Sequence, residues 1–278
     1  MEIVTPQQLL ETPDLIAVGV AGDEVRRRMH GTRTTFVRVF EVHVDAPPQA
    51  LPPRVSAGEF RIVGRPSTLD AAVAAVRATV ALSGSVPVTG FSVADLVALP
   101  TALSDICHAL RDAGLTAVTH LPLDVILDPL EVVGEVREAG LALATMTVDS
   151  LDEDGRIQIC DRARLLQHAA GAFQAFAPLP RRVSPGSATT GYDDLKQVAL
   201  ARVMVANVPS IQVDWALYGP KLAQVALTVG ADDVDNVAAV DPGVLGTRRS
   251  PLEEIKGNIK AAALEPVERD GLFGERRV

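Results

Sequence analysis

Residues 171–235 read GAFQAFAPLPRRVSPGSATTGYDDLKQVALARVMVANVPSIQVDWALYGPKLAQVALTVGADDVD and contain two consecutive strand–helix units. Segments rich in β-branched and aromatic residues at Phe173–Ala177 and Ile211–Ala216 predict strands. Runs of helix-forming residues follow them, at Tyr192–Val205 and Tyr218–Thr228. Because strands that alternate with helices are typical of parallel βαβ units, this stretch predicts an α/β fold.

The rest of the chain repeats the same pattern. Further strands are predicted at Thr35–Val44, Glu59–Val63, Val86–Thr89, Ala117–His120, Ala142–Val148 and Val234–Ala239. Further helices are predicted at Pro6–Leu10, Asp14–Met29, Ser67–Leu82, Val93–Ala113, Ile126–Ala139, Asp152–Ala170 and Pro251–Ala263. This repetition predicts a (β/α)8 TIM-like barrel, with an open doubly wound sheet as the alternative. We expect one domain: an N-terminal helical cap at 1–34, the barrel at 35–263 and a C-terminal tail at 264–278.

The connection between the first two strands breaks the pattern. Asp45–Gly58 reads DAPPQALPPRVSAG, and its four prolines prevent a regular helix. The barrel is therefore expected to be incomplete at its first βα unit, in one of two ways. Either it is open on that side, or the loop plugs it.

Composition excludes several classes of protein. The 278-residue chain has a net charge of −9, which argues against a general nucleic-acid binder because phosphate binding needs a basic face. Two cysteines give no disulfide framework and suit a reducing cytoplasm. We find no signal-peptide pattern and no apolar run long enough for a membrane span. A cytoplasmic location is the expectation.

The stretch from Gly171 to Asp235 resembles the C-terminal half of the radical S-adenosylmethionine enzymes of the aminofutalosine synthase group. That group includes dehypoxanthine futalosine cyclase and a subunit of deazaflavin (FO) synthase. Weaker matches are VRRRMHG at Val25–Gly31, FRIVG at Phe60–Gly64, LRDAGL at Leu110–Leu115 and EPVERDGLF at Glu265–Phe273. The resemblance implies a barrel and an association with menaquinone biosynthesis through the futalosine pathway.

The chain departs from that group where the cofactors bind. The group holds a 4Fe-4S cluster with a CxxxCxxC loop, whereas this chain has only Cys107 and Cys160. One or two remote cysteines cannot supply three cluster thiolates. Both lie on helical patterns and are interpreted as packing residues. We expect no cluster and no radical chemistry. S-adenosylmethionine binding is in doubt, because Thr147–Ser150 lacks the Gly and Glu that the group has in this loop.

Polar residues near the ends of strands five to seven form the candidate site, because barrel sites lie at the C-terminal ends of strands. Arg181 and Arg182 could bind a carboxylate, and the resemblance implies carboxylate substrates; the alternative is a surface basic pair. The candidate ligand-binding residues are Arg181, Arg182, Gln212, Asp214, Tyr218 and Asp149. Gln212 and Asp214 share one face of their strand. An unpaired buried Asp214 would be costly, so we expect Arg181 or Lys221 as its partner.

Three functions are compatible with these patterns. The first is a cluster-less relative that binds a small carboxylate or nucleoside-like ligand, with or without non-radical chemistry. The second is a non-catalytic partner of an active, cysteine-bearing paralogue. The third is a metal-dependent barrel hydrolase, with His43, Asp45 and His120 as candidate ligands beside Asp149.

Overall fold

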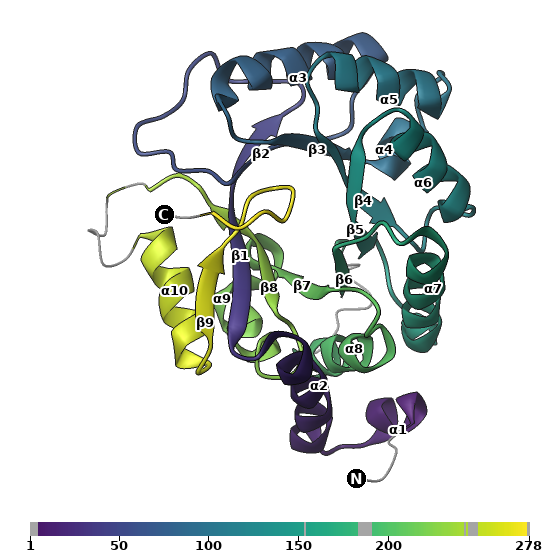
Figure 1. Cartoon of the computed structure of the whole chain (residues 1–278), viewed down its shortest axis with the longest axis vertical. Helices are drawn as coiled ribbons and strands as arrows, with labels where there is room; N and C mark the ends of the chain where they lie inside the picture. The colour runs from purple at the N-terminus through teal and green to yellow at the C-terminus, as the bar shows by residue number, and fades with distance from the viewer. Residues whose placement is uncertain (1–4, 153, 183–190, 242, 244–249, 277–278) are drawn as a thin grey trace.

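Eight parallel strands close into a barrel in the computed structural model, which describes residues 5–152, 154–182, 191–241, 243 and 250–276. The strands are β1 (Arg33–His43), β2 (Glu59–Val63), β3 (Val88–Ser92), β4 (Ala117–Pro122), β5 (Ala142–Val148), β6 (Ala175–Pro180), β7 (Ser210–Asp214) and β8 (Asp233–Ala238). Each strand from β2 to β7 pairs with the next, and β1 pairs with both β8 and β2 (Figure 1). The predicted barrel is confirmed, and the open sheet is wrong.

Helices surround the barrel in the order that the sequence predicts (Figure 1). They are α3 (Leu69–Ser83), α4 (Val93–Leu96), α5 (Leu103–Asp112), α6 (Pro129–Glu138), α7 (Gly155–Ala170), α8 (Gly191–Met204), α9 (Trp215–Ala226) and α10 (Pro251–Ala261). Side-chain caps begin several of them: Thr68 accepts from the Ala71 amide at 3.1 Å. The predicted helix Val93–Ala113 is in fact two helices, since Pro100 lies between α4 and α5.

The proline-rich loop between β1 and β2 neither opens nor plugs the barrel. Val39–His43 pairs directly with Glu59–Val63, so the barrel is closed at the first βα unit and that expectation of incompleteness was wrong. The loop instead runs outside the strands, beside the end of β8 (Figure 1). Its Ser56 amide donates to the Ala239 carbonyl at 2.9 Å. The loop thus lies where a helix would normally connect β1 to β2. It does not cover the mouth of the barrel, which is at the C-terminal ends of the strands.

The C-terminal tail adds a strand and then enters the barrel. Strand β9 (Glu265–Glu268) pairs in parallel with Arg33–Phe36, which the sequence analysis did not predict. Beyond β9 the Gly271 amide donates to the Gly58 carbonyl at 3.1 Å. The Arg269 guanidinium lies 4.0 Å from the centre of the Phe273 ring. The tail therefore covers the N-terminal end of the barrel, opposite the mouth.

The two N-terminal helices lie against α8 (Figure 1). They are α1 (Pro6–Glu11) and α2 (Leu15–His30). Gly22 allows close packing, because a Cβ there would lie 2.0 Å from the Val229 carbonyl oxygen. At the end of α2, the His30 imidazole is 2.8 Å from the Pro209 carbonyl oxygen.

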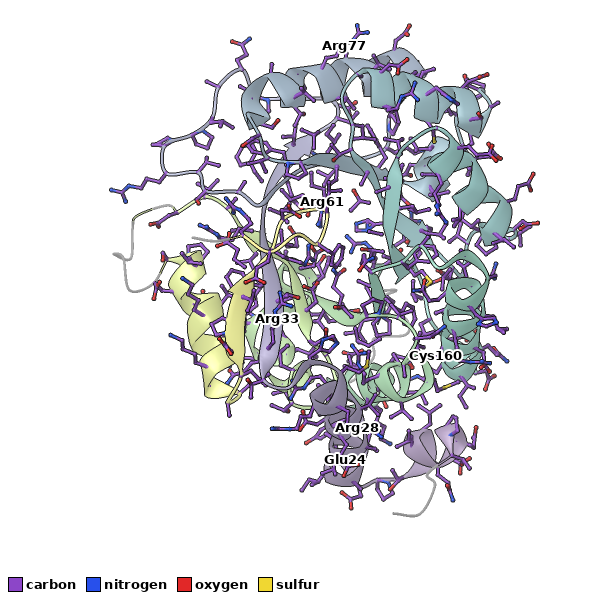
Figure 2. All side chains as sticks on the ribbon, viewed as in Figure 1. Glu24, Arg28, Arg33, Arg61, Arg77 and Cys160 are labelled. Carbon is purple, nitrogen blue, oxygen red and sulfur yellow. The ribbon has the colours of Figure 1, made fainter. Side chains whose placement is uncertain are left out.

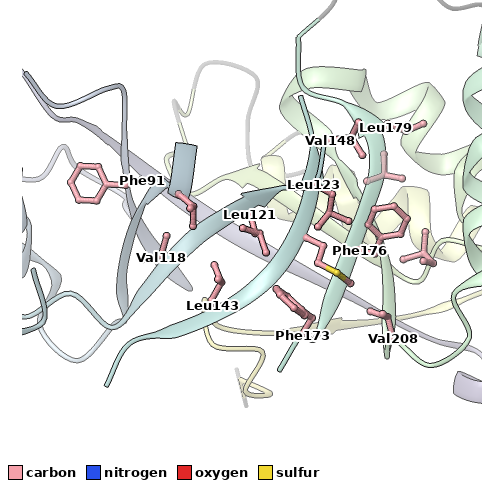
Figure 3. Packing of buried hydrophobic residues seen from close by; sticks show 14 of the residues in the cluster. Phe91, Val118, Leu121, Leu123, Leu143, Val148, Phe173, Phe176, Leu179 and Val208 are labelled. Atoms are coloured by element: carbon pink, nitrogen blue, oxygen red, sulfur yellow. The ribbon is translucent and has the colours of Figure 1, made fainter. Parts of the chain in front are cut away.

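The apolar core lies between the strands and the helices. Figure 3 shows part of it, with Leu121, Leu143 and Phe176 buried among their neighbours. Both cysteines are buried in this core on α5 and α7. Within the described part of the chain, no helix is long and apolar enough to cross a membrane. The inside of the barrel, in contrast, is strongly polar, and this is where candidate sites lie.

Candidate functional site at the barrel mouth

A cavity of about 230 Å³ opens at the C-terminal ends of strands β2 to β6. Its lining residues are Arg61, Ile62, Val63, Gly64, Phe91, Ser92, Asp95, Thr119, His120, Asp149, Arg181 and Arg182. We call it the mouth cavity. Three of the six residues predicted from the sequence line it: Arg181, Arg182 and Asp149.

Arg181 is held by Asp214. The Arg181 Nη1 atom is 3.3 Å from Asp214 Oδ2, which confirms one of the two partners expected for this carboxylate. Asp214 Oδ1 accepts from the Leu217 amide at 2.9 Å and thereby caps α9. Burial raises the pKa of Asp214, and nearby Asp235 raises it further, while Arg181 opposes both effects. Asp214 thus orients Arg181 at the edge of the cavity.

Arg182 and Asp149 form a second, more open pair. Arg182 Nε lies 3.2 Å from Asp149 Oδ2, and the Arg182 side chain is 75% exposed. Partial burial raises the pKa of Asp149, although Arg182 lowers it. Asp124 fixes the loop that follows β5 and carries Asp149. Its carboxylate oxygens accept hydrogen bonds from the amides of Asp149 and Ser150, both at 2.8 Å.

The other two predicted residues lie elsewhere. Tyr218 donates its hydroxyl hydrogen to the Pro180 carbonyl at 2.6 Å, and burial raises its pKa. Gln212 lies deeper in the barrel and donates to Asp233 Oδ2 at 2.8 Å. Neither Gln212 nor Tyr218 lines the mouth cavity. Their hydrogen bonds show that both support neighbouring groups of the barrel.

A buried network of charges below the mouth was missed by the sequence analysis. Its centre is Arg61, labelled inside the barrel in Figure 2, which donates to Glu59 at 2.7 and 2.9 Å. Arg61 also donates to Asp235 through two bonds of 2.8 Å. From the tail, Arg269 donates to Asp233 through two bonds of 2.7 Å. Burial alone would raise the pKa of Asp235, but Arg61 and Arg269 hold it well below its usual value.

One local signal could have revealed this network. In β2, Glu59 and Arg61 share one face while Phe60 and Ile62 share the other. Since Phe60 and Ile62 are buried in the apolar core, the charged face must point into the barrel. A buried charge requires a partner, but the sequence does not show that it is Asp235.

His120 stands between the mouth cavity and this network. Burial lowers the pKa of His120 well below its usual value, and Arg181 and Arg61 lower it further. The imidazole is therefore neutral near pH 7. Its Nδ1 atom is buried and has no hydrogen-bond partner among the described residues.

The side chains proposed as metal ligands do not come together. Among the described residues, no group of three or more His, Cys, Asp or Glu could hold a metal ion. His43 and Asp45 are exposed at the end of β1, whereas His120 lies in the barrel. This arrangement gives no support to the metal-hydrolase alternative.

The two thiols also do not fit an iron–sulfur cluster. Cys107 and Cys160 belong to different helices and are fully buried. Burial raises the pKa of Cys107 to about 11 and raises that of Cys160 further. Cluster ligation needs several convergent thiolates. Neither cysteine lines the mouth cavity.

Comparison with known families places the resemblance in the C-terminal part of the chain. Residues 172–278 match the family model described as the CofH/MqnC C-terminal region. Residues 183–190, within the Gly171–Asp235 stretch, lie outside the described part of the structure. The described part of the match runs from the start of β6 to the tail and supplies Arg181, Asp214 and Asp235.

Curated relatives give the same assignment. Aminodeoxyfutalosine synthase of Thermus thermophilus is 31% identical in an alignment 208 residues long, and the match covers 63% of this chain and 55% of that protein. A 5-amino-6-(D-ribitylamino)uracil--L-tyrosine 4-hydroxyphenyl transferase of Methanothermobacter thermautotrophicus is 31% identical in an alignment 166 residues long, and the match covers 52% of this chain and 44% of that protein. The chain thus spans about half the length of these relatives. It resembles the aminofutalosine synthase and FO synthase group of radical S-adenosylmethionine enzymes.

Solved structures share the fold at low sequence identity. HydG, a maturase of the FeFe-hydrogenase, aligns with a TM-score of 0.63 at 13% identity, over 95% of this chain and 72% of that one. Methylornithine synthase (PylB) aligns with a TM-score of 0.62 at 12% identity, over 95% of this chain and 94% of that one. At this identity the likeness extends to the barrel fold alone.

Proposed function

We propose that this chain is a cluster-less relative of the futalosine-pathway enzymes, and that its barrel mouth binds a small carboxylate or nucleoside-like ligand. The names of its relatives support the pathway, and the mouth cavity supports the ligand class. The chemistry proposed for the site is recognition of an anion, with no step that depends on an iron–sulfur cluster.

The observation that carries the proposal is the partly unused guanidinium of Arg181. A guanidinium has five N–H groups. Among the described residues, only Asp214 accepts a hydrogen bond from Arg181. The side chain is 24% exposed and lines the mouth cavity. Arg181 is therefore oriented by a carboxylate and still has donors for a second one, in the planar geometry that suits bidentate binding.

The charges around the mouth favour the same class of ligand. Arg61, Arg181 and Arg182 line the cavity, against Asp95 and Asp149. Three guanidiniums thus line the cavity against two carboxylates, and Arg61 is also paired with Glu59 and Asp235 below the mouth.

A thermal-shift experiment tests the proposal with aminodeoxyfutalosine and 3-phenylpropanoate as probes, and with 3-phenylpropanamide as the uncharged match. We expect the carboxylates to raise the Tm, because a ligand that binds only the folded state stabilises it. The amide is expected to have little effect. The Arg181→Ala variant should lose the shift, and Arg77→Ala should keep it. Arg77 lies on the outside of α3, away from the barrel interior (Figure 2).

The non-catalytic partner function predicts a different outcome. In that case the chain would associate with a cysteine-bearing paralogue, and the mouth would need no ligand. Equal shifts for acid and amide, or no shift with any probe, would contradict the carboxylate site. Retention of the shift in Arg181→Ala would contradict the role of Arg181.

A further inference from the structure

A second, smaller cavity lies directly below the mouth. This deep cavity of about 20 Å³ lies among the inner residues of the barrel, including Gln212, Asp235 and Arg269. It shares three lining residues with the mouth cavity: Arg61, Thr119 and His120. These three residues therefore lie between the two cavities, and we call them the floor.

Each floor residue has a polar group without a partner among the described residues. Thr119 Oγ1 and His120 Nδ1 are buried and make no hydrogen bond. Arg61 uses Nε, both N–H groups of Nη2 and one N–H of Nη1, so Nη1 keeps one N–H. Buried polar groups are almost always paired, and an unpaired one costs free energy. Three polar groups without partners, all between the two cavities, indicate that a polar group of a ligand binds there.

We propose that the floor is a subsite for one uncharged oxygen of the ligand, a hydroxyl or a carbonyl, while the ligand's carboxylate lies against Arg181. This inference rests on the proposed function. It makes the ligand a hydroxy- or oxo-carboxylic acid whose oxygen is directed into the barrel. Arg61 donates to that oxygen, and Thr119 and His120 donate or accept according to its chemistry.

The size of the deep cavity supports a single oxygen. A volume of about 20 Å³ holds one water-sized group. A hydroxyl or carbonyl oxygen is of this size, whereas a carboxylate or phosphate is larger. The body of the ligand therefore stays in the mouth cavity, and one oxygen reaches the floor.

The charges below the floor support an uncharged group. The network there has three carboxylates, Glu59, Asp233 and Asp235, against two guanidiniums, Arg61 and Arg269. The neutral His120 adds no positive charge to this balance. A second anion at the floor would meet an excess of negative charge, whereas an uncharged oxygen pairs the free donors without this repulsion.

Calorimetric titration with matched acids tests the subsite. The probes are the three positional isomers of 3-(hydroxyphenyl)propanoate and the parent 3-phenylpropanoate. We expect at least one hydroxy acid to bind the wild-type protein roughly tenfold more tightly than the parent, the factor that one well-placed hydrogen bond contributes. Thr119→Val and His120→Gln should reduce this preference, and the double variant should abolish it.

Thr147→Val is the matched control. Thr147 Oγ1 is also buried without a partner among the described residues, but Thr147 lines neither cavity. Loss of the Thr147 hydroxyl should leave the preference for the hydroxy acid unchanged. A comparable loss in Thr147→Val would overturn the assignment to the floor.

The outcomes separate this inference from the proposed function. If all four acids bind the wild-type protein equally and Arg181→Ala weakens them all, the floor subsite is wrong and the carboxylate site stands. If the hydroxy acid is preferred but the floor variants keep the preference, the oxygen binds elsewhere and the subsite is again wrong. If no acid binds at millimolar concentration, both proposals are overturned.

Discussion

Arg61 and Asp235 meet inside the barrel through two parallel hydrogen bonds, Nη1 to Oδ2 and Nη2 to Oδ1, each 2.8 Å long. The pair joins β2 to β8 across 174 residues of sequence. It also links the two ends of the barrel, because Arg61 lines the mouth while Asp235 lies 3.7 Å from Arg269 of the tail. The mouth and the C-terminal tail therefore share one buried network.

Asp235→Asn should destabilise the fold near neutral pH. Arg61 keeps Glu59 and Arg269 keeps Asp233, so the change weakens one partner of each guanidinium and should cost about 1–3 kcal/mol. Urea unfolding measures the loss. As a control, Glu275→Gln removes an exposed pair with Arg33 and should cost less than about 1 kcal/mol.

The Asp235 effect should also depend on pH with a defined sign. The folded-state pKa of Asp235 is held below the unfolded value of about 3.9. Its contribution is therefore present above the unfolded pKa and is lost as pH falls towards the folded one. The difference between wild type and Asp235→Asn should shrink below about pH 4. A difference that stays constant or grows as pH falls would contradict the ion-pair account.

Arg269→Ala tests whether the tail holds the network together. Its loss would leave Asp233 without its bidentate partner inside the barrel. We expect a loss of about 3–5 kcal/mol by urea unfolding. Arg276→Ala is the comparison, because Glu268 keeps Arg38 as a second partner. Equal effects of the two changes would show that the tail acts only through general packing.

Thr119→Val should stabilise the protein or leave its stability unchanged. The substitution removes a buried hydroxyl that has no partner among the described residues. Thr89→Val, also inside the barrel, removes a hydroxyl that donates to Glu59 and should destabilise by about 1–3 kcal/mol. Thermal unfolding of the two variants checks the contrast. A large destabilisation by Thr119→Val would mean that this hydroxyl has a structural role.

Both cysteines should resist thiol reagents in the native state. They are fully buried, and burial raises the pKa of Cys107 to about 11, so the reactive thiolate is scarce near pH 7. Ellman's reagent should label both only after denaturation. Anaerobic reconstitution with iron and sulfide should leave no stoichiometric cluster. Absorbance near 400 nm with stoichiometric iron would contradict the cluster-less proposal.

The sequence predicted the barrel because each strand–helix unit has local signals. Turn glycines such as Gly140 and Gly171 follow helices with positive φ and provide such local signals. The break at Pro100 and strand β9 were missed. Pro100 interrupts a continuous apolar pattern, and β9 exists only through its pairing with β1, a contact that no local signal shows.

The sequence predicted only part of the candidate site. Arg181 and Asp214 stood out because both lie where barrel strands end. The floor did not, because Arg61 and Thr119 gain their meaning from two cavities that only the closed barrel creates. His120 was considered only as a metal ligand. Its unpaired Nδ1 atom becomes visible once its surroundings are known.

Calorimetric titration of aminodeoxyfutalosine into wild type, Arg181→Ala and Arg77→Ala tests whether Arg181 binds the carboxylate of a ligand at the barrel mouth. We expect saturable binding to wild type and Arg77→Ala. Arg181→Ala should bind at least tenfold more weakly, because a charged hydrogen bond to the carboxylate is lost. Equal affinity of wild type and Arg181→Ala, or no binding to wild type at all, would contradict this role of Arg181.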